Sequence, residues 1–214
     1  SEEYGLTINE IEQKGFYIYK RVKMSLDNDS TSSTAKAIGV GIMGFADIFD
    51  SFKPDFVVIV GDRYEMLAAG ISAMIANLPI VHIGGGEVTQ GSFDEAIRHS
   101  LTKMSHFHFV STESYRKRVI QLGEIENTVF NVGSLSIENL KEIKLLNKKQ
   151  LEEEIDFSFG NKNITVTLHP ETNKVGFEKQ NFQQLINALY ELSDINIIFT
   201  EPNADPNRNI ISKM

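Results

Sequence analysis

The chain has 214 residues, of which 41% are hydrophobic and 23% charged, and its formal net charge is −8. This composition is typical of a globular protein with one large domain or one and a half, and the acidic balance argues against a dedicated nucleic-acid or anionic-membrane surface. The absence of cysteine excludes disulfides and thiolate zinc sites. No uncharged run approaches the length of a membrane span, and no signal-like segment opens the chain, so we expect a cytoplasmic protein without a membrane partner.

The first fifty residues predict a short polar segment, an edge strand and a long helix. Residues 2–14 are polar and fit a short helix or turn, and the alternation in Phe16–Val22 fits a strand near a sheet edge. Apolar residues recur every three or four positions over Thr34–Phe52, which predicts an amphipathic helix. We attribute the glycines inside it to close packing. Its apolar face suits a homo-oligomer, a dimer or tetramer.

Residues 56–98 are the part of the chain around which the rest is organised. Phe56–Val60 and Ile80–Ile83 are short, apolar and β-branched, which predicts strands, and Glu65–Asn77 predicts a helix that is apolar nearly all round. A strand, a helix and a second strand buried on both faces form the unit of a parallel sheet. In open α/β sheets the ligand binds in the crevice outside the carboxyl ends of the strands.

Acidic residues follow both of these strands. Asp62 follows the first strand after one glycine, Glu87 follows the second after Gly84–Gly86, and Asp94 and Glu95 open the next helix. Carboxylates that converge on one crevice indicate acid–base chemistry or a cationic ligand, although Asp62 also fits a helix N-cap without a chemical role. Three consecutive glycines are costly to order, which favours close approach of their backbone to a ligand over a plain turn.

The same helix carries two oppositely charged pairs. Asp94 and Arg98, and likewise Glu95 and His99, are four residues apart and fit ordinary surface pairs. Their position at the mouth of the crevice also fits a role in binding or catalysis.

The alternation of strands and helices continues beyond this centre. The predicted elements are the helix Phe93–Met104, the strand Ser105–Val110, the helix Glu113–Leu122 and the strand Val129–Val132. Residues 138–162 are rich in Lys, Glu and Asn with little apolar periodicity, which indicates a helix and then a linker. The alternation then restarts with the strand Ile164–Leu168, the helix Phe177–Leu192 and the strand Ile195–Phe199. We therefore expect one nearly complete α/β domain at 1–140, a helix and linker at 141–162, and the start of a second domain at 163–214.

The histidines differ in their expected roles. His106-x-His108 has the spacing of a chelating pair on a strand, but no further ligand is evident nearby, so we expect no metal site. His82 is expected to be satisfied within its strand. His169 leaves a strand at the start of the second domain, where it would face the cleft between domains, and both a structural and a catalytic role fit that place.

Four stretches together resemble the UDP-N-acetylglucosamine 2-epimerases. They are Gly61–Glu65, Val81–Gln90 with its Gly-Gly-Gly-Glu-Val-Thr, Asp94-Glu95 with Ile97-Arg98-His99, and Val166–Pro170. The resemblance is to the hydrolysing branch of the family. The non-hydrolysing branch usually carries a Thr-rich run after Gly-Asp, where this chain has Arg-Tyr-Glu.

The resemblance implies a glycosyltransferase-B-like α/β fold of two Rossmann-like, doubly wound domains, the second of them nucleotide-binding, with a UDP-sugar in the cleft. It implies a hydrolase that converts UDP-N-acetylglucosamine and water to N-acetylmannosamine and UDP for sialic acid biosynthesis. The route would be anti elimination to 2-acetamidoglucal and then addition of water, without a metal or cofactor.

The resemblance also assigns residues. The catalytic ones would be Asp62, Glu87, Asp94 or its neighbour Glu95, and His169, which would lie near the diphosphate. The substrate-binding ones would be Arg63, Gly85, Gly86, Arg98, His99 and Glu171. A base and an acid are needed to remove a non-acidified C2 proton and to add water, and carboxylates in different environments can serve as both.

Three other functions remain open. The first is a hydrolysing epimerase for a UDP-2,4-diacetamido-trideoxyhexose on the route to legionaminic-type sugars, which would use the same carboxylates. The second is a glycosyltransferase, which needs fewer carboxylates. The third is a non-catalytic nucleotide-sugar binding module, which would bind without turnover.

We further expect these 214 residues to be part of a longer protein. The chain begins at Ser1 without Met and stops at Met214 with no terminating element. The family has a first strand and a Gly-Thr-Arg-type loop that would precede Ser1, and a diphosphate-binding loop that would follow Met214. The piece alone is therefore expected to be inactive or nearly so.

Overall fold

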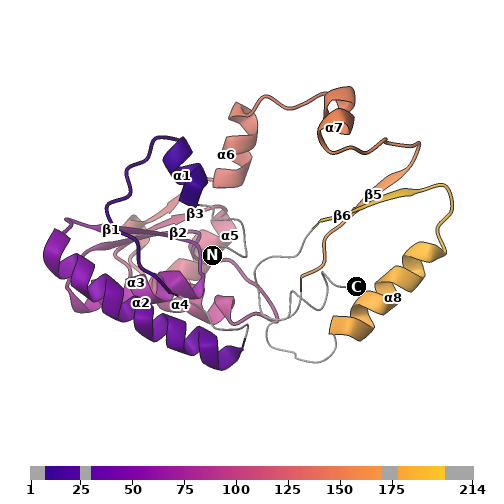
Figure 1. Cartoon of the computed structure of the whole chain (residues 1–214). Coiled ribbons are helices and arrows are strands. Elements are labelled where there is room, and N and C mark those ends of the chain that lie inside the picture. The colour runs from indigo at the N-terminus through magenta and orange to yellow at the C-terminus, as the bar shows by residue number, and fades with distance from the viewer. Residues whose placement is uncertain (1–7, 25–29, 170–177, 201–214) are drawn as a thin grey trace. The chain divides into compact units, whose positions relative to one another are not determined.

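The computed structural model describes residues 8–24, 30–169 and 178–200, and Figure 1 shows the course of the chain. The chain divides into two compact units, Ser1–Leu135 and Ser136–Met214, which are described separately below. The predicted domain limits stay a prediction. Among the helices of the described residues, none combines the length and the apolar character that crossing a membrane requires.

The first unit contains a four-stranded parallel sheet in the order β1-β2-β3-β4. Its strands are β1 (Val57–Val60), β2 (Ile80–Ile83), β3 (Phe107–Val110) and β4 (Val129–Asn131). The connecting helices are α3 (Tyr64–Ile75), α4 (Asp94–Met104) and α5 (Glu113–Gln121), with the short 3₁₀ turn η1 (Glu126–Thr128) before β4. The crossover predicted around residues 56–98 is confirmed, and the predicted strands and helices agree with these bounds within two residues.

One face of this sheet holds the main core. Ile59 and Ile80 from the strands pack with Phe49 of α2 (Thr31–Phe52) and with residues of α3 and α4 such as Leu101. Figure 1 shows α2, α3 and α4 together below the sheet. The prediction that the strands are buried on both faces is wrong for the described residues, because these helices all pack on one face and side chains on the other, such as Val60, stay half exposed.

Helix α2 packs closely through two of its glycines. A Cβ on Gly41 would lie 2.9 Å from the Cβ of Ala68 in α3, and one on Gly44 would lie 2.7 Å from Cγ1 of Val22. A Cβ on Gly39 would meet nothing within 4 Å. The packing explanation is therefore confirmed at two of the three positions.

Residues 16–24 form no strand, so the edge strand predicted at Phe16–Val22 is wrong. The short helix α1 (Ile8–Gln13) precedes this stretch, whose residues instead lie against α2. The ring of Tyr19 lies 4.3 Å from that of Phe52, and Val22 packs at Gly44. The apolar alternation of this segment therefore goes with packing against the side of α2. Alternation alone does not make a strand, because a strand also needs a partner strand to pair with.

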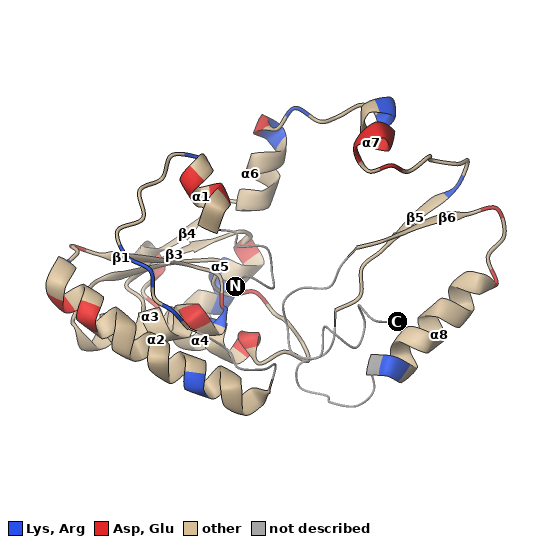
Figure 2. Ribbon diagram, in the orientation of Figure 1, with Lys and Arg blue, Asp and Glu red and all other residues tan. Residues whose placement is uncertain are grey.

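The second unit contains a two-stranded parallel sheet of β5 (Asn163–Val166) and β6 (Asn196–Phe199), joined by α8 (Glu178–Tyr190). This confirms the restart of the strand–helix–strand alternation. The charge-rich stretch before it contains α6 (Leu135–Glu142) and α7 (Lys148–Glu154), and Figure 2 shows acidic and basic residues on both helices.

Candidate active site

Arg98 is the centre of a polar cluster at the carboxyl ends of β1 and β2. It lies on α4 with only 5% of its surface exposed. Its guanidinium forms an ion pair with the Asp62 carboxylate and donates hydrogen bonds to the Glu87 carbonyl at 3.1 Å and to Oγ1 of Thr89 at 2.9 Å. One buried cation therefore connects the turn after β1 to the loop after β2. The predicted surface pair with Asp94 is replaced by this pair with Asp62.

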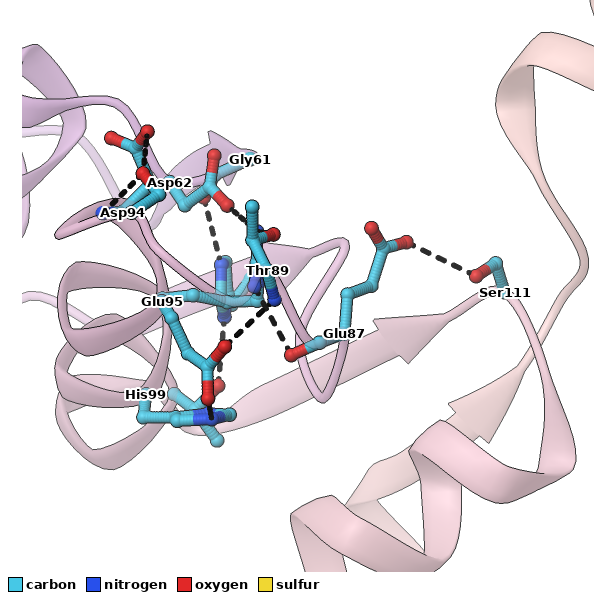
Figure 3. A network of polar contacts seen from close by, with 12 residues as sticks. Gly61, Asp62, Glu87, Thr89, Asp94, Glu95, His99 and Ser111 are labelled. Carbon is cyan, nitrogen blue, oxygen red and sulfur yellow. Dashed lines mark hydrogen bonds and ion pairs between the residues drawn. The ribbon is translucent and has the colours of Figure 1, made fainter. Parts of the chain in front are cut away.

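Glu87 extends away from this cluster. Its carboxylate accepts a hydrogen bond from Oγ of Ser111 at 3.2 Å, and Figure 3 shows the side chain reaching toward Ser111 at the end of β3. Asp62, Glu87 and Ser111 thus follow three neighbouring strands. Sequence analysis missed Ser111, although its position directly after a predicted strand was a usable signal.

Asp94 and Glu95 are adjacent in sequence but make different contacts. Asp94 accepts a hydrogen bond from Oγ of Ser92 at 2.7 Å. Glu95 accepts the backbone N–H of Thr89 at 2.7 Å, and its other oxygen lies 4.0 Å from Nε2 of His99. Figure 3 shows the Glu95 side chain between the Thr89 loop and His99, whereas the Asp94 side chain lies away from His99. Glu95 is therefore tied to the loop that Arg98 also holds, and the predicted pairing of Glu95 with His99 is present.

Two of the three glycines after β2, Gly85 and Gly86, are explained by packing inside this unit. Gly85 and Gly86 are buried, and Gly86 has a positive φ of 80°. A Cβ on Gly86 would lie 2.5 Å from the Tyr115 carbonyl oxygen of α5, and one on Gly85 would lie 3.0 Å from Oγ1 of Thr102. Arg118 donates to the carbonyl of Gly86. Close approach to a ligand is not needed to account for them, and their contact with substrate stays a prediction.

His82 lies beneath the cluster and is fully buried. Its Nε2 is 3.0 Å from the Gly61 carbonyl oxygen, and its Nδ1 is 3.2 Å from Oγ1 of Thr102. His82 is therefore satisfied, but by the turn after β1 and by α4 rather than within its own strand, as the sequence had suggested. Burial lowers the pKa of His82 from 6.5 to about 4, because a charged imidazolium would lose its solvation there.

Arg63 precedes α3, next to Asp62. Its guanidinium lies over the ring of Tyr64, 5.6 Å from the centroid, and its Nε is 3.7 Å from the Glu65 carboxylate. Burial, together with the neighbouring Glu65 charge, raises the pKa of Tyr64 to about 12. The predicted role of Arg63 in substrate binding stays a prediction.

Two predicted site residues belong to the second unit. His169 lies three residues after Val166, the last residue of β5, within the described part of the chain. Glu171 lies outside the described residues. The roles predicted for both stay predictions.

The pair His106-x-His108 has contacts of another kind. Nδ1 of His106 accepts the backbone N–H of Ile80 at 3.2 Å, and the buried His108 has its Nε2 3.2 Å from the Glu124 carboxylate. In the part of the chain that the structure describes, no three His, Cys, Asp or Glu side chains are grouped to hold a metal ion.

The comparisons with known proteins agree on one family. The family model described as UDP-N-acetylglucosamine 2-epimerase matches residues 1–214. The chain is 43% identical over 214 residues to a GDP/UDP-N,N'-diacetylbacillosamine 2-epimerase (hydrolyzing) of Campylobacter jejuni, covering 100% of this chain and 56% of that protein. It is 40% identical over 211 residues to the polysialic acid biosynthesis protein P7 of Escherichia coli, covering 98% of this chain and 54% of that protein.

A solved structure gives the same result for the fold. The UDP-GlcNAc 2-epimerase of Neisseria meningitidis bound to UDP-GlcNAc matches with a TM-score of 0.74 at 21% identity, covering 95% of this chain and 57% of that one. This likeness confirms the predicted glycosyltransferase-B-like α/β fold, of which the present chain is a part. The chain spans about half the length of the curated relatives it matches. From the family match and these relatives, the chain belongs to the UDP-N-acetylglucosamine 2-epimerase family, in its hydrolysing branch.

Proposed function

We propose that the whole protein is a hydrolysing 2-epimerase that acts on a UDP-linked 2-acetamido sugar and releases UDP and the free 2-epimeric sugar. The observation that carries the proposal is the Arg98 cluster, which gathers Asp62 and the Glu87 loop at the carboxyl edge of a parallel sheet. That edge is where ligands bind in folds of this class. The relatives' names support the reaction type.

The chemistry needs proton transfer in two steps. In the first, a base removes the C2 proton while the C1–O bond breaks, so that a C1–C2 double bond forms and UDP leaves with the bonding electrons. In the second, water adds its hydroxyl to C1, and an acid delivers a proton to the opposite face of C2. Positioned carboxylates can perform both kinds of transfer.

The described carboxylates have distinct surroundings, and separate acid and base roles require such a difference. Asp62 pairs with a buried cation, Glu87 accepts from the neutral hydroxyl of Ser111, and Glu95 accepts a backbone N–H. Groups in different environments can take the acid and base roles separately. We assign the proton transfers to Asp62, Glu87 and one of Asp94 and Glu95.

Two substrates fit this proposal. UDP-N-acetylglucosamine, which would yield N-acetylmannosamine, is the substrate in the name of the structural neighbour from Neisseria. The relative at 43% identity is named for N,N'-diacetylbacillosamine, which favours a UDP-2,4-diacetamido-trideoxyhexose. Both sugars share the 2-acetamido group and the C2 proton, so the same carboxylates would serve, and we would assay them in parallel.

The test uses the full-length protein with each UDP-sugar in deuterated water, followed by proton NMR. Free UDP together with a C2-deuterated 2-epimeric sugar is the expected result. Asp62→Asn and Glu87→Gln should lower kcat by about 10²- to 10⁴-fold, the range for loss of a general acid or base. Glu126→Gln, at an exposed glutamate of η1, is the matched control and should leave kcat unchanged.

Two outcomes would overturn the proposal. Conversion to the UDP-linked 2-epimer without free UDP would make the protein a non-hydrolysing epimerase. Binding of both UDP-sugars without turnover, equally strong in Asp62→Asn and Glu87→Gln, would make it a binding module.

A further inference from the structure

The turn that presents Asp62 is held by hydrogen bonds. Gly61 has a φ of 77°, and a Cβ placed on it would meet nothing within 4 Å, so side-chain packing does not fix its position. Its N–H donates to the carbonyl of Ile83 at 2.9 Å. Its carbonyl lies 3.0 Å from Nε2 of His82. Both backbone groups of Gly61 are thus bound by residues of β2.

The contacts of His82 determine which nitrogen carries the proton. A backbone carbonyl only accepts hydrogen bonds, so Nε2 of His82 must donate to Gly61. In the neutral imidazole the other nitrogen is an acceptor, and Nδ1 therefore accepts from the Thr102 hydroxyl. The pKa of about 4 keeps this ring neutral at physiological pH. The ring is consequently a fixed donor aimed at one carbonyl.

The same ring contacts the other parts of the site. Thr102 lies one turn after Arg98 on α4. A Cβ on Gly85 would approach Nδ1 of His82 to 3.2 Å, so the ring packs tightly against the loop that leads to Glu87. A single buried side chain therefore touches the Asp62 turn, the glycine loop and the helix that carries Arg98.

We propose that His82 is a positioning residue, whose Nε2–H holds the Gly61 carbonyl and thereby fixes the peptide that carries Asp62 in its reactive orientation. This inference rests on the role proposed for Asp62. In this proposed role, His82 itself does not contact the substrate. Because a displacement of about 1 Å in a reacting group can lower a rate about 10²-fold, loss of this hydrogen bond should be seen mainly in kcat.

Two substitutions separate the hydrogen bond from the bulk of the ring. Glutamine can carry its amide nitrogen to the place of Nε2, whereas the amide of asparagine ends where Nδ1 lies. In the full-length protein, His82→Asn keeps a partner for Thr102 but loses the donor to Gly61. It should lower kcat about 10²-fold with little change in KM. His82→Gln restores the donor and should recover most of that loss.

The outcomes distinguish this inference from the proposed function. Equal kcat in wild type, His82→Asn and His82→Gln, or equal losses in both variants, would overturn the positioning role while the function stands. Melting temperatures of both variants are measured alongside, because a purely structural role would lower them without this kcat difference. A wild-type protein that releases no UDP from either sugar would overturn the function, and the inference with it.

A second measurement needs no variant to fold. Nitrogen-15 NMR of the histidine rings in the full-length wild type reports the tautomer of His82 directly. The Nε2–H tautomer at pH 7 is the expected result. An Nδ1–H tautomer or an imidazolium at that pH would overturn the proposal.

Discussion

Replacement of Arg98 by methionine tests whether this residue holds the site together. Methionine fills similar space with an apolar, flexible side chain. It removes the ion pair with Asp62 and the hydrogen bonds to the Glu87 carbonyl and to Thr89. The Asp62 carboxylate, with 20% of its side chain exposed, is then left without its cation.

The size of the effect follows from that burial. Breaking a buried pair by removing one partner costs about 3–5 kcal/mol, and the partial exposure of Asp62 puts the expected loss at about 3 kcal/mol. In an Asp62→Asn background the same replacement leaves no carboxylate without its cation, and it should cost only about 1–2 kcal/mol, as lost hydrogen bonds do. The difference of about 1–2 kcal/mol is the coupling between Arg98 and Asp62.

Native-state hydrogen exchange on the full-length protein is the suitable assay. It reports the opening free energy of peptides from residues 57–104 without assuming that a multidomain protein unfolds in one step. The four members of the Arg98/Asp62 cycle are compared at one pH and salt concentration. A loss below about 1 kcal/mol in Arg98→Met, or an equal loss in the Asp62→Asn background, would refute the reasoning.

Three further predictions concern the frame around the site. His82 has a pKa of about 4 in the folded protein and an ordinary pKa of 6.5 in the unfolded chain, so the unfolded chain binds more protons between these values. The contribution of neutral His82 to the free energy of unfolding is therefore fully present above pH 6.5 and falls by about 3 kcal/mol as the pH drops to 4. The opening free energy measured by hydrogen exchange should show this fall in wild type, and His82→Gln should show a flatter pH profile. Gly86→Ala should lower the melting temperature by several degrees, because the added Cβ would clash with backbone at a residue whose φ is positive. Gly39→Ala, on the exposed surface of α2, should raise the melting temperature slightly. Equal effects of the two substitutions would contradict the packing explanation. Thr112→Ala removes the side-chain oxygen that caps α5, and it should lower the opening free energy measured by hydrogen exchange by about 1 kcal/mol. An unchanged opening free energy would show that this cap does not stabilise the helix.

The strand–helix–strand centre could be predicted from sequence because its signals are local. The β-branched runs of β1 and β2 and the apolar helix between them need no knowledge of distant residues. The rule that ligands bind at the carboxyl ends of parallel strands then placed Asp62 and Glu87 at one edge. The structure brings both residues to that edge through Arg98.

The contacts of Arg98 and His82 could not be predicted in the same way. Spacing on a helix suggested that Arg98 pairs with Asp94, but the three-dimensional register brings Asp62, 36 residues earlier, to its guanidinium. His82 looked like a histidine satisfied within its own strand, and its link to Gly61 depends on the pairing of β1 with β2. The strand predicted at Phe16–Val22 was wrong for the same reason. A strand needs a partner that is distant in the sequence, and this segment packs on α2 instead.

The cluster separates residues that build the site from residues that are available for chemistry. Arg98 and His82 are buried and hold backbone carbonyls as well as side chains, so their replacement should lower both stability and kcat. Glu87 is half-buried, and glutamine in its place can still accept the Ser111 hydrogen bond. Glu87→Gln should therefore lower kcat and leave the opening free energy nearly unchanged. This contrast distinguishes an acid–base carboxylate from a structural one, because only a group that must give or take a proton loses its function when its shape and hydrogen bond are kept.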